Sequence, residues 1–144
     1  MRRVLAGALL VLAVGAGSAR AARTPLPGVV TPSGNISCFY VPVGHMLCDI
    51  KAAGYLADLQ NRCQRASGLD WHGFTVAVGR RATFNCSGGI LYNEGADVPR
   101  YRRLAYGRTW RFGAFTCVSR VTGLTCTSRD GHGLFLSRQS WRAW

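Results

Sequence analysis

Six cysteines constrain the fold of this chain more than any other feature, and all of them follow a hydrophobic N-terminal stretch. An even number of cysteines in a small chain with an export leader is typical of a disulfide framework. We therefore predict three disulfides, each contributing about 2–4 kcal/mol to stability. The cysteines are Cys38, Cys48, Cys63, Cys86, Cys117 and Cys126.

The chain begins with the pattern of a secretory signal peptide. Residues 1–3 carry two arginines, and the apolar stretch 4–14 follows them. This stretch is too short to span a bilayer, which requires about 20 residues. We predict a signal peptide over residues 1–21 that is cleaved after Ala21, with cleavage after Ala19 as the alternative. The mature protein is then secreted, without a stable membrane anchor.

The predicted mature chain is strongly basic. Loss of the leader removes three of the 18 basic residues, which leaves 15 against six acidic ones and a net charge of about +9. A basic secreted protein is attracted to anionic partners such as wall polymers, phospholipid headgroups and nucleic acid. The alternative explanation is codon usage, because every basic residue except Lys51 is an arginine.

The composition indicates one domain after a lead-in. Residues 22–32 contain three of the five prolines and show no hydrophobic periodicity, so we predict a flexible N-terminal lead-in there. No linker, low-complexity run or block of like charge divides the rest. Residues 33–144 are therefore expected to form a single six-cysteine domain with a modest core.

Short runs of β-forming residues between turn residues predict strands and hairpins. Cys38 lies opposite Cys48 in the first hairpin, and Cys117 lies opposite Cys126 in the third. Of the 15 pairings that six cysteines allow, the sequential one closes these two hairpins and leaves Cys63–Cys86. The predicted strands are 36–41, 46–50, 74–78, 82–86, 109–112, 114–119, 124–128 and 134–137.

One segment departs from the strand pattern. Leu56, Leu59 and Cys63 follow a helical spacing, which predicts a short helix near 54–65, with an extended connection as the alternative. Many short strands at turn spacing are typical of mainly β domains. We predict a small antiparallel β sandwich or barrel stapled by disulfides.

Several motifs occur together in order. They include PSGNISC at 32–38, LAYG at 104–107, GLTC at 123–126 and GHGLFLSR at 131–138. The series resembles a family of small secreted actinobacterial proteins with a six-cysteine domain of unknown function and the pattern PSGNIxC … GxTC … GHGFxxSR. The resemblance covers residues 33–141 and implies secretion, three disulfides and one domain, but no activity. The chain departs from the pattern at Leu134, where the family has phenylalanine, and at 54–62, where a proline-rich stretch is expected.

The segment 100–112 interleaves arginines with aromatic side chains. Guanidinium groups bind phosphates and carboxylates, and aromatic rings stack on bases or sugars, so this composition suits an anionic glycan or single-stranded nucleic acid. The alternative is a solvated, arginine-rich surface. The candidate binding residues in this segment are Arg100, Arg102, Arg103, Arg108, Trp110 and Arg111.

His132, which lies between two glycines, is the remaining candidate binding residue. A histidine in such a turn can act as an acid, a base or a ligand. The alternative is a ring packed on an aromatic neighbour. The three histidines lie far apart and no C-x-x-C occurs, so we predict no metal site and no cofactor. We identify no catalytic residue, since the chain has neither G-x-S-x-G nor a recognisable carboxylate pair.

These features favour a secreted, non-enzymatic domain that binds an extracellular anionic partner such as a cell-wall polymer. Nucleic acid as that partner has no specific support in the sequence. Two alternatives stay open, a small secreted hydrolase of nuclease type and an inhibitor of a foreign extracellular enzyme. His132 beside Glu94 or an aspartate in a cleft would favour the hydrolase. A flat arginine and aromatic face would favour the binding domain, and a protruding loop at 93–103 the inhibitor.

Overall fold

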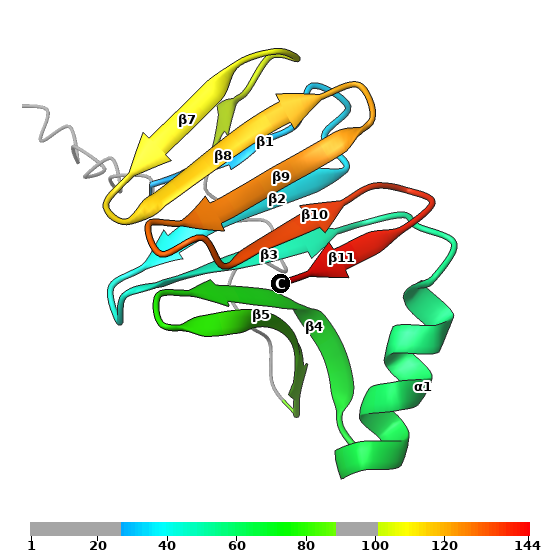
Figure 1. The fold of residues 1–144 in the computed structure, drawn as a ribbon. Helices are drawn as coiled ribbons and strands as arrows, with labels where there is room; N and C mark the ends of the chain where they lie inside the picture. The colour runs from blue at the N-terminus through cyan, green and yellow to red at the C-terminus, as the bar shows by residue number, and fades with distance from the viewer. Residues whose placement is uncertain (1–26, 89–100) are drawn as a thin grey trace, which may run out of the picture.

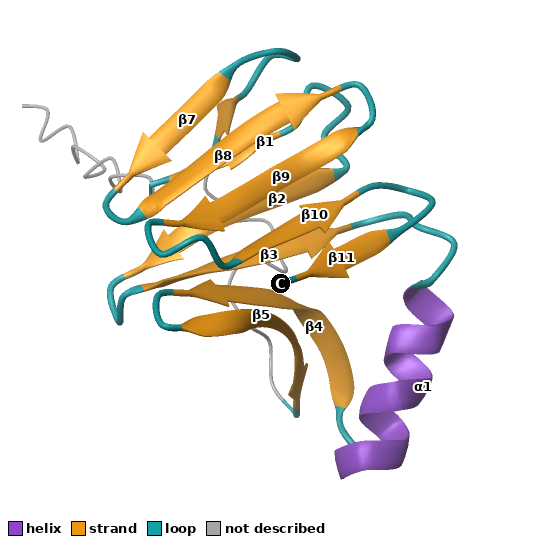
Figure 2. Cartoon of the chain, viewed as in Figure 1, coloured by secondary structure: helices purple, strands orange, loops and turns teal. Residues whose placement is uncertain are grey.

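The computed structural model describes residues 27–88 and 101–144, and most of the structure there is β-strand (Figure 2). A single α-helix interrupts the strands of the described residues. The elements in chain order are β1 (Gly28–Val30), β2 (Ile36–Val41), β3 (His45–Ile50), α1 (Leu56–Ser67), β4 (Asp70–Ala77), β5 (Arg80–Ser87), β6 (Arg102–Arg103), β7 (Thr109–Phe112), β8 (Phe115–Arg120), β9 (Gly123–Ser128), β10 (Gly133–Leu136) and β11 (Trp141–Ala143).

The strands form two sheets that pack face to face (Figure 1). Sheet A has the order β5-β4-β3-β2-β1-β6, and sheet B has the order β11-β10-β9-β8-β7. Neighbouring strands are antiparallel except β1 and β6, which pair in parallel. The prediction of a mainly β fold is confirmed, and two separate sheets decide between sandwich and barrel in favour of a sandwich.

The two cysteine hairpins have the predicted register. Cys38 pairs with Cys48 between β2 and β3, and Cys117 pairs with Cys126 between β8 and β9. Each pair is a disulfide with its Cα atoms 4.1 Å apart. Turn length sets register in a hairpin, so these pairings follow from local sequence.

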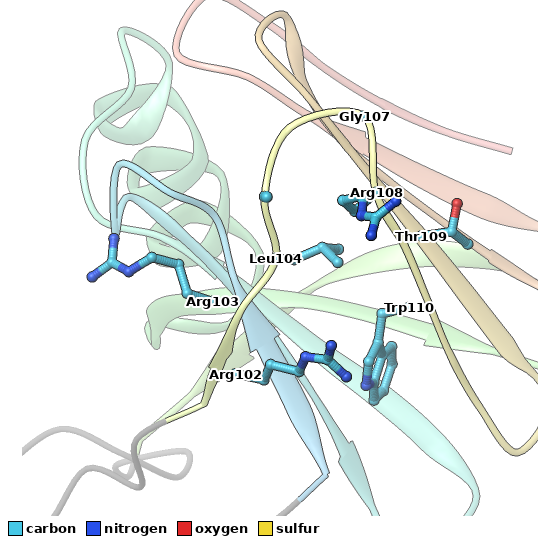
Figure 3. A pocket seen from close by; sticks show the side chains of 8 residues that line it. Arg102, Arg103, Leu104, Gly107, Arg108, Thr109 and Trp110 are labelled. Atoms are coloured by element: carbon cyan, nitrogen blue, oxygen red, sulfur yellow. The ribbon is translucent and has the colours of Figure 1, made fainter.

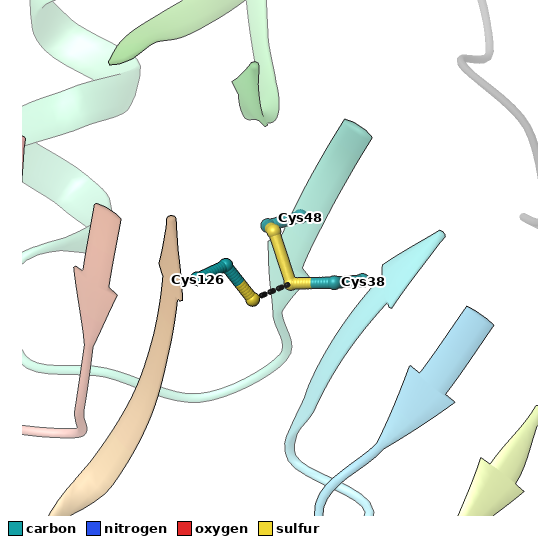
Figure 4. A group of neighbouring side chains, drawn as sticks. All are labelled: Cys38, Cys48 and Cys126. Atoms are coloured by element: carbon teal, nitrogen blue, oxygen red, sulfur yellow. Dashed lines mark hydrogen bonds between the residues drawn. A yellow bond between two sulfur atoms is a disulfide. The ribbon is translucent and has the colours of Figure 1, made fainter. Parts of the chain in front are cut away.

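The two hairpin disulfides meet in the centre of the sandwich (Figure 4). The Sγ atoms of Cys126 and Cys38 are 3.6 Å apart, and all four half-cystines are at most 1% exposed. Disulfide sulfurs carry no hydrogen, so this is a van der Waals contact. The sulfurs therefore fill the middle of the core, where side chains from both sheets interdigitate.

Aromatic side chains join the sheets on either side of this centre. Tyr40 of β2 contacts Phe115 of β8, with ring centroids 6.2 Å apart. On the other side Trp141 of β11 contacts Phe74 of β4 at 5.1 Å and Phe84 of β5 at 6.4 Å. Trp141, near the C-terminus, therefore belongs to the contact between the two sheets.

The predicted helix is present and lies against β4 and β5. Leu59 and Cys63 are fully buried, as the spacing predicts, and Leu56 is partly buried. The helix ends at Gly68, which adopts a left-handed conformation with φ +68° and donates its N–H to Gln64. The third predicted disulfide, Cys63–Cys86, fixes α1 to β5.

The prediction of a flexible lead-in is wrong for residues 28–30, which form β1. Val29 is fully buried, and β1 pairs with β2 on one side and β6 on the other. Gly28 permits this because a Cβ there would lie 2.9 Å from the Cys38 carbonyl oxygen. Prolines flank the strand without interrupting it. The β1–β6 pair is the one parallel pair among the described strands of this otherwise antiparallel sandwich.

No helix within residues 27–88 and 101–144 is long and apolar enough to cross a bilayer.

The position of a disulfide should matter more to stability here than the length of the loop it closes. Loop-closure entropy favours Cys63–Cys86 over Cys117–Cys126 by about 0.8 kcal/mol, because their sequence separations are 23 and 9. Replacing Cys117 and Cys126 by alanine also leaves a cavity beside the Cys38 sulfur. We expect C117A/C126A to lose more unfolding free energy in urea than C63A/C86A. The opposite ranking would show that loop entropy dominates.

Candidate anion-binding site

A pocket of about 460 Å³ opens where the chain passes from sheet A to sheet B (Figure 3). One wall is β6, the edge strand of sheet A, and the other is β7, the edge strand of sheet B. The loop between these strands closes the end. The lining residues are Arg102, Arg103, Leu104, Ala105, Gly107, Arg108, Thr109 and Trp110.

Backbone hydrogen bonds hold the connecting loop against both sheets. Leu104 is buried, and its N–H donates to Val30 of β1 at 2.8 Å. Arg108 donates its N–H to Ala105 in a tight turn, in which Gly107 has φ +79°. Gly107 and Arg108 also exchange backbone hydrogen bonds with Ser119 of β8, at 2.7 and 3.0 Å. The backbone that carries the arginines is therefore fixed at both ends.

Two arginines and a tryptophan face one another across the pocket. In Figure 3 the guanidinium of Arg102 extends toward the ring of Trp110, and Arg108 stands at the closed end. Among the described residues, neither arginine forms an ion pair and no carboxylate lines the pocket. Two cations without a described counter-charge create a local positive potential, which favours a bound anion.

Trp110 is held in place by a chain of rings. It stacks on Phe112 with centroids 5.9 Å apart and planes 11° apart. Phe112 in turn contacts Tyr40 of sheet A at 5.0 Å. Phe112 is 38% exposed, so the aromatic wall continues from the pocket to the surface. Rings of this kind stack on sugars or bases.

The structure brings four of the predicted binding residues together and separates two others from them. Arg103 lines the pocket, but its side chain turns away from Trp110 and donates a hydrogen bond to the Pro32 carbonyl (Figure 3). Arg111 pairs with Thr116 and therefore lies on the outer face of sheet B. Arg100 lies outside the described residues, as does most of the loop at 93–103. His132 lies in the turn between β9 and β10 and is not among the residues that line the pocket.

His132 lies beside an aspartate, but neither residue lines the pocket between β6 and β7. The Nε2 atom of His132 is 3.9 Å from Asp130 Oδ2. The hydroxyl of Ser128 is shared between Asp130 Oδ1 and the His132 carbonyl, so its contact with His132 is with the backbone and not with the imidazole. The backbone N–H of Gly79 also donates to Asp130. This carboxylate thus joins the β9–β10 turn to the β4–β5 turn.

The titration of Asp130 provides a test of that structural role. The hydroxyl of Ser128 and the N–H of Gly79 lower the pKa of Asp130 from its usual 3.8. A carboxylate with a lowered folded-state pKa stabilises the fold above the unfolded value and loses that contribution as the pH falls through the folded one. We expect D130N to unfold at lower urea than the wild type at pH 7 and to differ less at pH 3. A difference independent of pH would contradict this account.

Sequence reasoning identified the arginines and Trp110 but missed that Leu104, Ala105, Gly107 and Thr109 complete the pocket. The LAYG turn is visible in the sequence. The pairing of β1 with β6, which fixes the loop before that turn, leaves no signal because β6 has only two residues.

Comparison with known proteins places the chain in a family without an assigned role. Residues 8–142 match a family of unknown function, DUF6636. The chain belongs to this family. The family and the three disulfides bear out the coarser part of the resemblance seen in the sequence. No curated protein and no solved structure matches the chain. DUF6636 therefore contributes no activity, and the function must be argued from the pocket.

Proposed function

We propose that the protein is an extracellular binding domain for an anionic polymer, which it holds in the pocket between β6 and β7. The observation that carries the proposal is that Arg102, directed at Trp110, shares a pocket with Arg108, and that no described carboxylate lines this pocket. Guanidinium groups make bidentate, charge-assisted hydrogen bonds to carboxylates and phosphates.

The charge distribution of the described residues supports an anionic ligand. Asp58 pairs with Arg62, and Asp70 accepts hydrogen bonds from Gln60 and Gln64 of α1. Asp130 is occupied by the turns that it joins. These carboxylates are therefore engaged elsewhere, and a ligand with negative charge is the natural partner of the pocket arginines.

The shape of the pocket favours a flexible strand or a small unit. The pocket lies between two sheet edges and is open to solvent, so a chain of repeating charged units can enter it sideways. An extracellular polymer such as an anionic wall component has this form, and the ring of Trp110 offers a stacking surface for its sugar units.

The three disulfides support an extracellular partner. Three disulfides are typical of proteins that fold in an oxidising compartment. We propose that residues 1–21 direct this export and are removed. Protein recovered from a culture supernatant is then expected to have an intact mass that begins at Ala22 and includes three disulfides. A mass that retains residues 1–21 in a membrane fraction would contradict the proposal.

The binding proposal predicts a steep salt dependence. Affinity for an anionic wall polymer should fall strongly between about 50 and 200 mM salt, because binding releases counterions. R102Q/R108Q should weaken binding at least about tenfold and should reduce the salt slope by about one for each arginine removed. Isothermal titration calorimetry at several salt concentrations measures both quantities.

A matched control separates the pocket from general charge. R65Q/R129Q removes the same charge from two exposed arginines that do not line the pocket. The control should change affinity little. Equal losses in both double variants would show that binding follows net charge and not the pocket.

A further inference from the structure

A second pocket, of about 330 Å³, lies at the end of the sandwich where several turns meet. It is formed by the turn before β2, the β8–β9 turn and the loop after β10, together with Tyr106 of the 104–108 loop. Figure 1 shows the β8–β9 turn and the β10–β11 loop at the same end of sheet B. Segments more than 100 residues apart in the chain therefore share one site.

The first wall of this second pocket is rigid. Thr31 bonds to Ile36 through both its backbone and its hydroxyl. The side-chain amide of Asn35 accepts from the Ala52 N–H at 2.9 Å and donates to the Ala52 carbonyl at 3.0 Å. This network fixes the turn, and the Ser33 side chain lies at its exposed edge.

The opposite wall is fixed in the same manner. The Ser137 hydroxyl bonds to the backbone of Ser140, and Tyr55 donates its hydroxyl hydrogen to the Ser137 carbonyl at 2.9 Å. The N–H of Gly54 donates to the Arg138 carbonyl at 2.9 Å. The backbone of Arg138 is thus anchored, while its side chain is exposed and makes no ion pair with a described residue.

Two arginines line this pocket, and no described residue supplies a counter-charge. Arg120, at the end of β8, and Arg138 both contribute to the lining, in which no described residue is a carboxylate. Like charges that share a pocket repel each other, and a bound anion removes that repulsion. Tyr106, which is 44% exposed, adds an aromatic ring and a hydroxyl at the edge.

The rest of the exposed lining is polar. Ser33, Thr122 and Gln139 are exposed there, whereas the hydroxyls of Thr31 and Ser137 are engaged within the walls. Exposed hydroxyl and amide groups pair with sugar hydroxyls, and Tyr106 is the one aromatic ring in the described lining on which a ring could stack. The volume is at the lower end of the range for small-ligand sites, about 300–1,000 Å³. We propose that this pocket binds an acidic sugar, with Arg120 and Arg138 on its carboxylate.

The two pockets lie on either side of one loop. Ala105, Gly107 and Arg108 line the pocket between β6 and β7, and Tyr106 of the same turn lines the second pocket. A single polymer chain can therefore cross the loop and occupy both. The identification of that polymer as an acidic polysaccharide rests on the proposed function, but the ligand of the second pocket does not.

The first experiment uses galacturonate as the probe and galactose as its neutral match. NMR titration of the mature protein with galacturonate should shift the backbone amide signals of residues 31–36, 120–123 and 137–139. Galactose should shift them far less, and R120Q/R138Q should lose the response. R102Q/R108Q should keep it. If galacturonate does not shift the amide signals of these segments, or shifts them equally in R120Q/R138Q, the proposed site is overturned.

Two further probes test the class of ligand. Inorganic phosphate that shifts the same amides as strongly as galacturonate would reduce the pocket to a general anion site and overturn the sugar assignment. If a single-stranded oligonucleotide shifts these amide signals and galacturonate does not, the sugar assignment is overturned in favour of nucleic acid.

The second experiment uses polygalacturonate and separates this inference from the proposed function. Calorimetry should show an affinity at least about tenfold lower for R120Q/R138Q than for the wild type, with little change for R65Q/R129Q. An unchanged affinity in R120Q/R138Q would refute a polymer that reaches the second pocket. An unchanged affinity in R102Q/R108Q alone would instead refute the proposed function and leave the acidic sugar site standing.

Discussion

The contact between two disulfides in the centre of the sandwich is the interaction on which the rest of the structure depends. Each of these disulfides joins two neighbouring strands of one sheet, and the third joins α1 to β5 of sheet A. None of the three crosslinks one sheet to the other. The sheets are held together by packing, with Cys126 and Cys38 sulfurs 3.6 Å apart at the middle and aromatic contacts on both sides. The disulfides make each sheet stiff, and complementary surfaces then decide how the two stiff sheets fit.

This arrangement explains why the candidate sites lie where they do. Both pockets are built from residues that connect the sheets or close their ends, and not from the faces that pack. The pocket between β6 and β7 has one wall in each sheet, so its width is set by the distance that the central sulfurs and Tyr40 impose. A binding site at the junction of two rigid layers is preorganised without extra structure, which lowers the entropic cost of binding.

Local sequence predicted the parts of the fold that depend on local interactions. The registers of both cysteine hairpins, the helix stripe through Leu59 and Cys63, and eight of the strands follow from turn residues and periodicity. The short strands β1, β6 and β11 did not appear, because two or three residues each are too few to show an alternating pattern. The arginines of the pocket could be identified from the composition of segment 100–112. The pocket itself could not, because the position of its β6 wall depends on the parallel β1–β6 pair.

The same distinction bears on codon usage as an explanation for the arginines. A compositional bias places arginines at many exposed positions, and several described ones have ordinary roles: Arg62 pairs with Asp58, Arg81 donates to the Ala143 carbonyl, and Arg142 lies over the Trp144 ring. Bias does not explain why arginines gather in pairs at pockets. Arg102 and Arg108 share one pocket, and Arg120 and Arg138 share another, with fixed backbones beneath them and no described carboxylate in either lining. Placing like charges together is unfavourable in a chain with a large positive net charge. Their convergence on rigid loops is therefore the feature that an anionic ligand accounts for and that a random surface distribution does not.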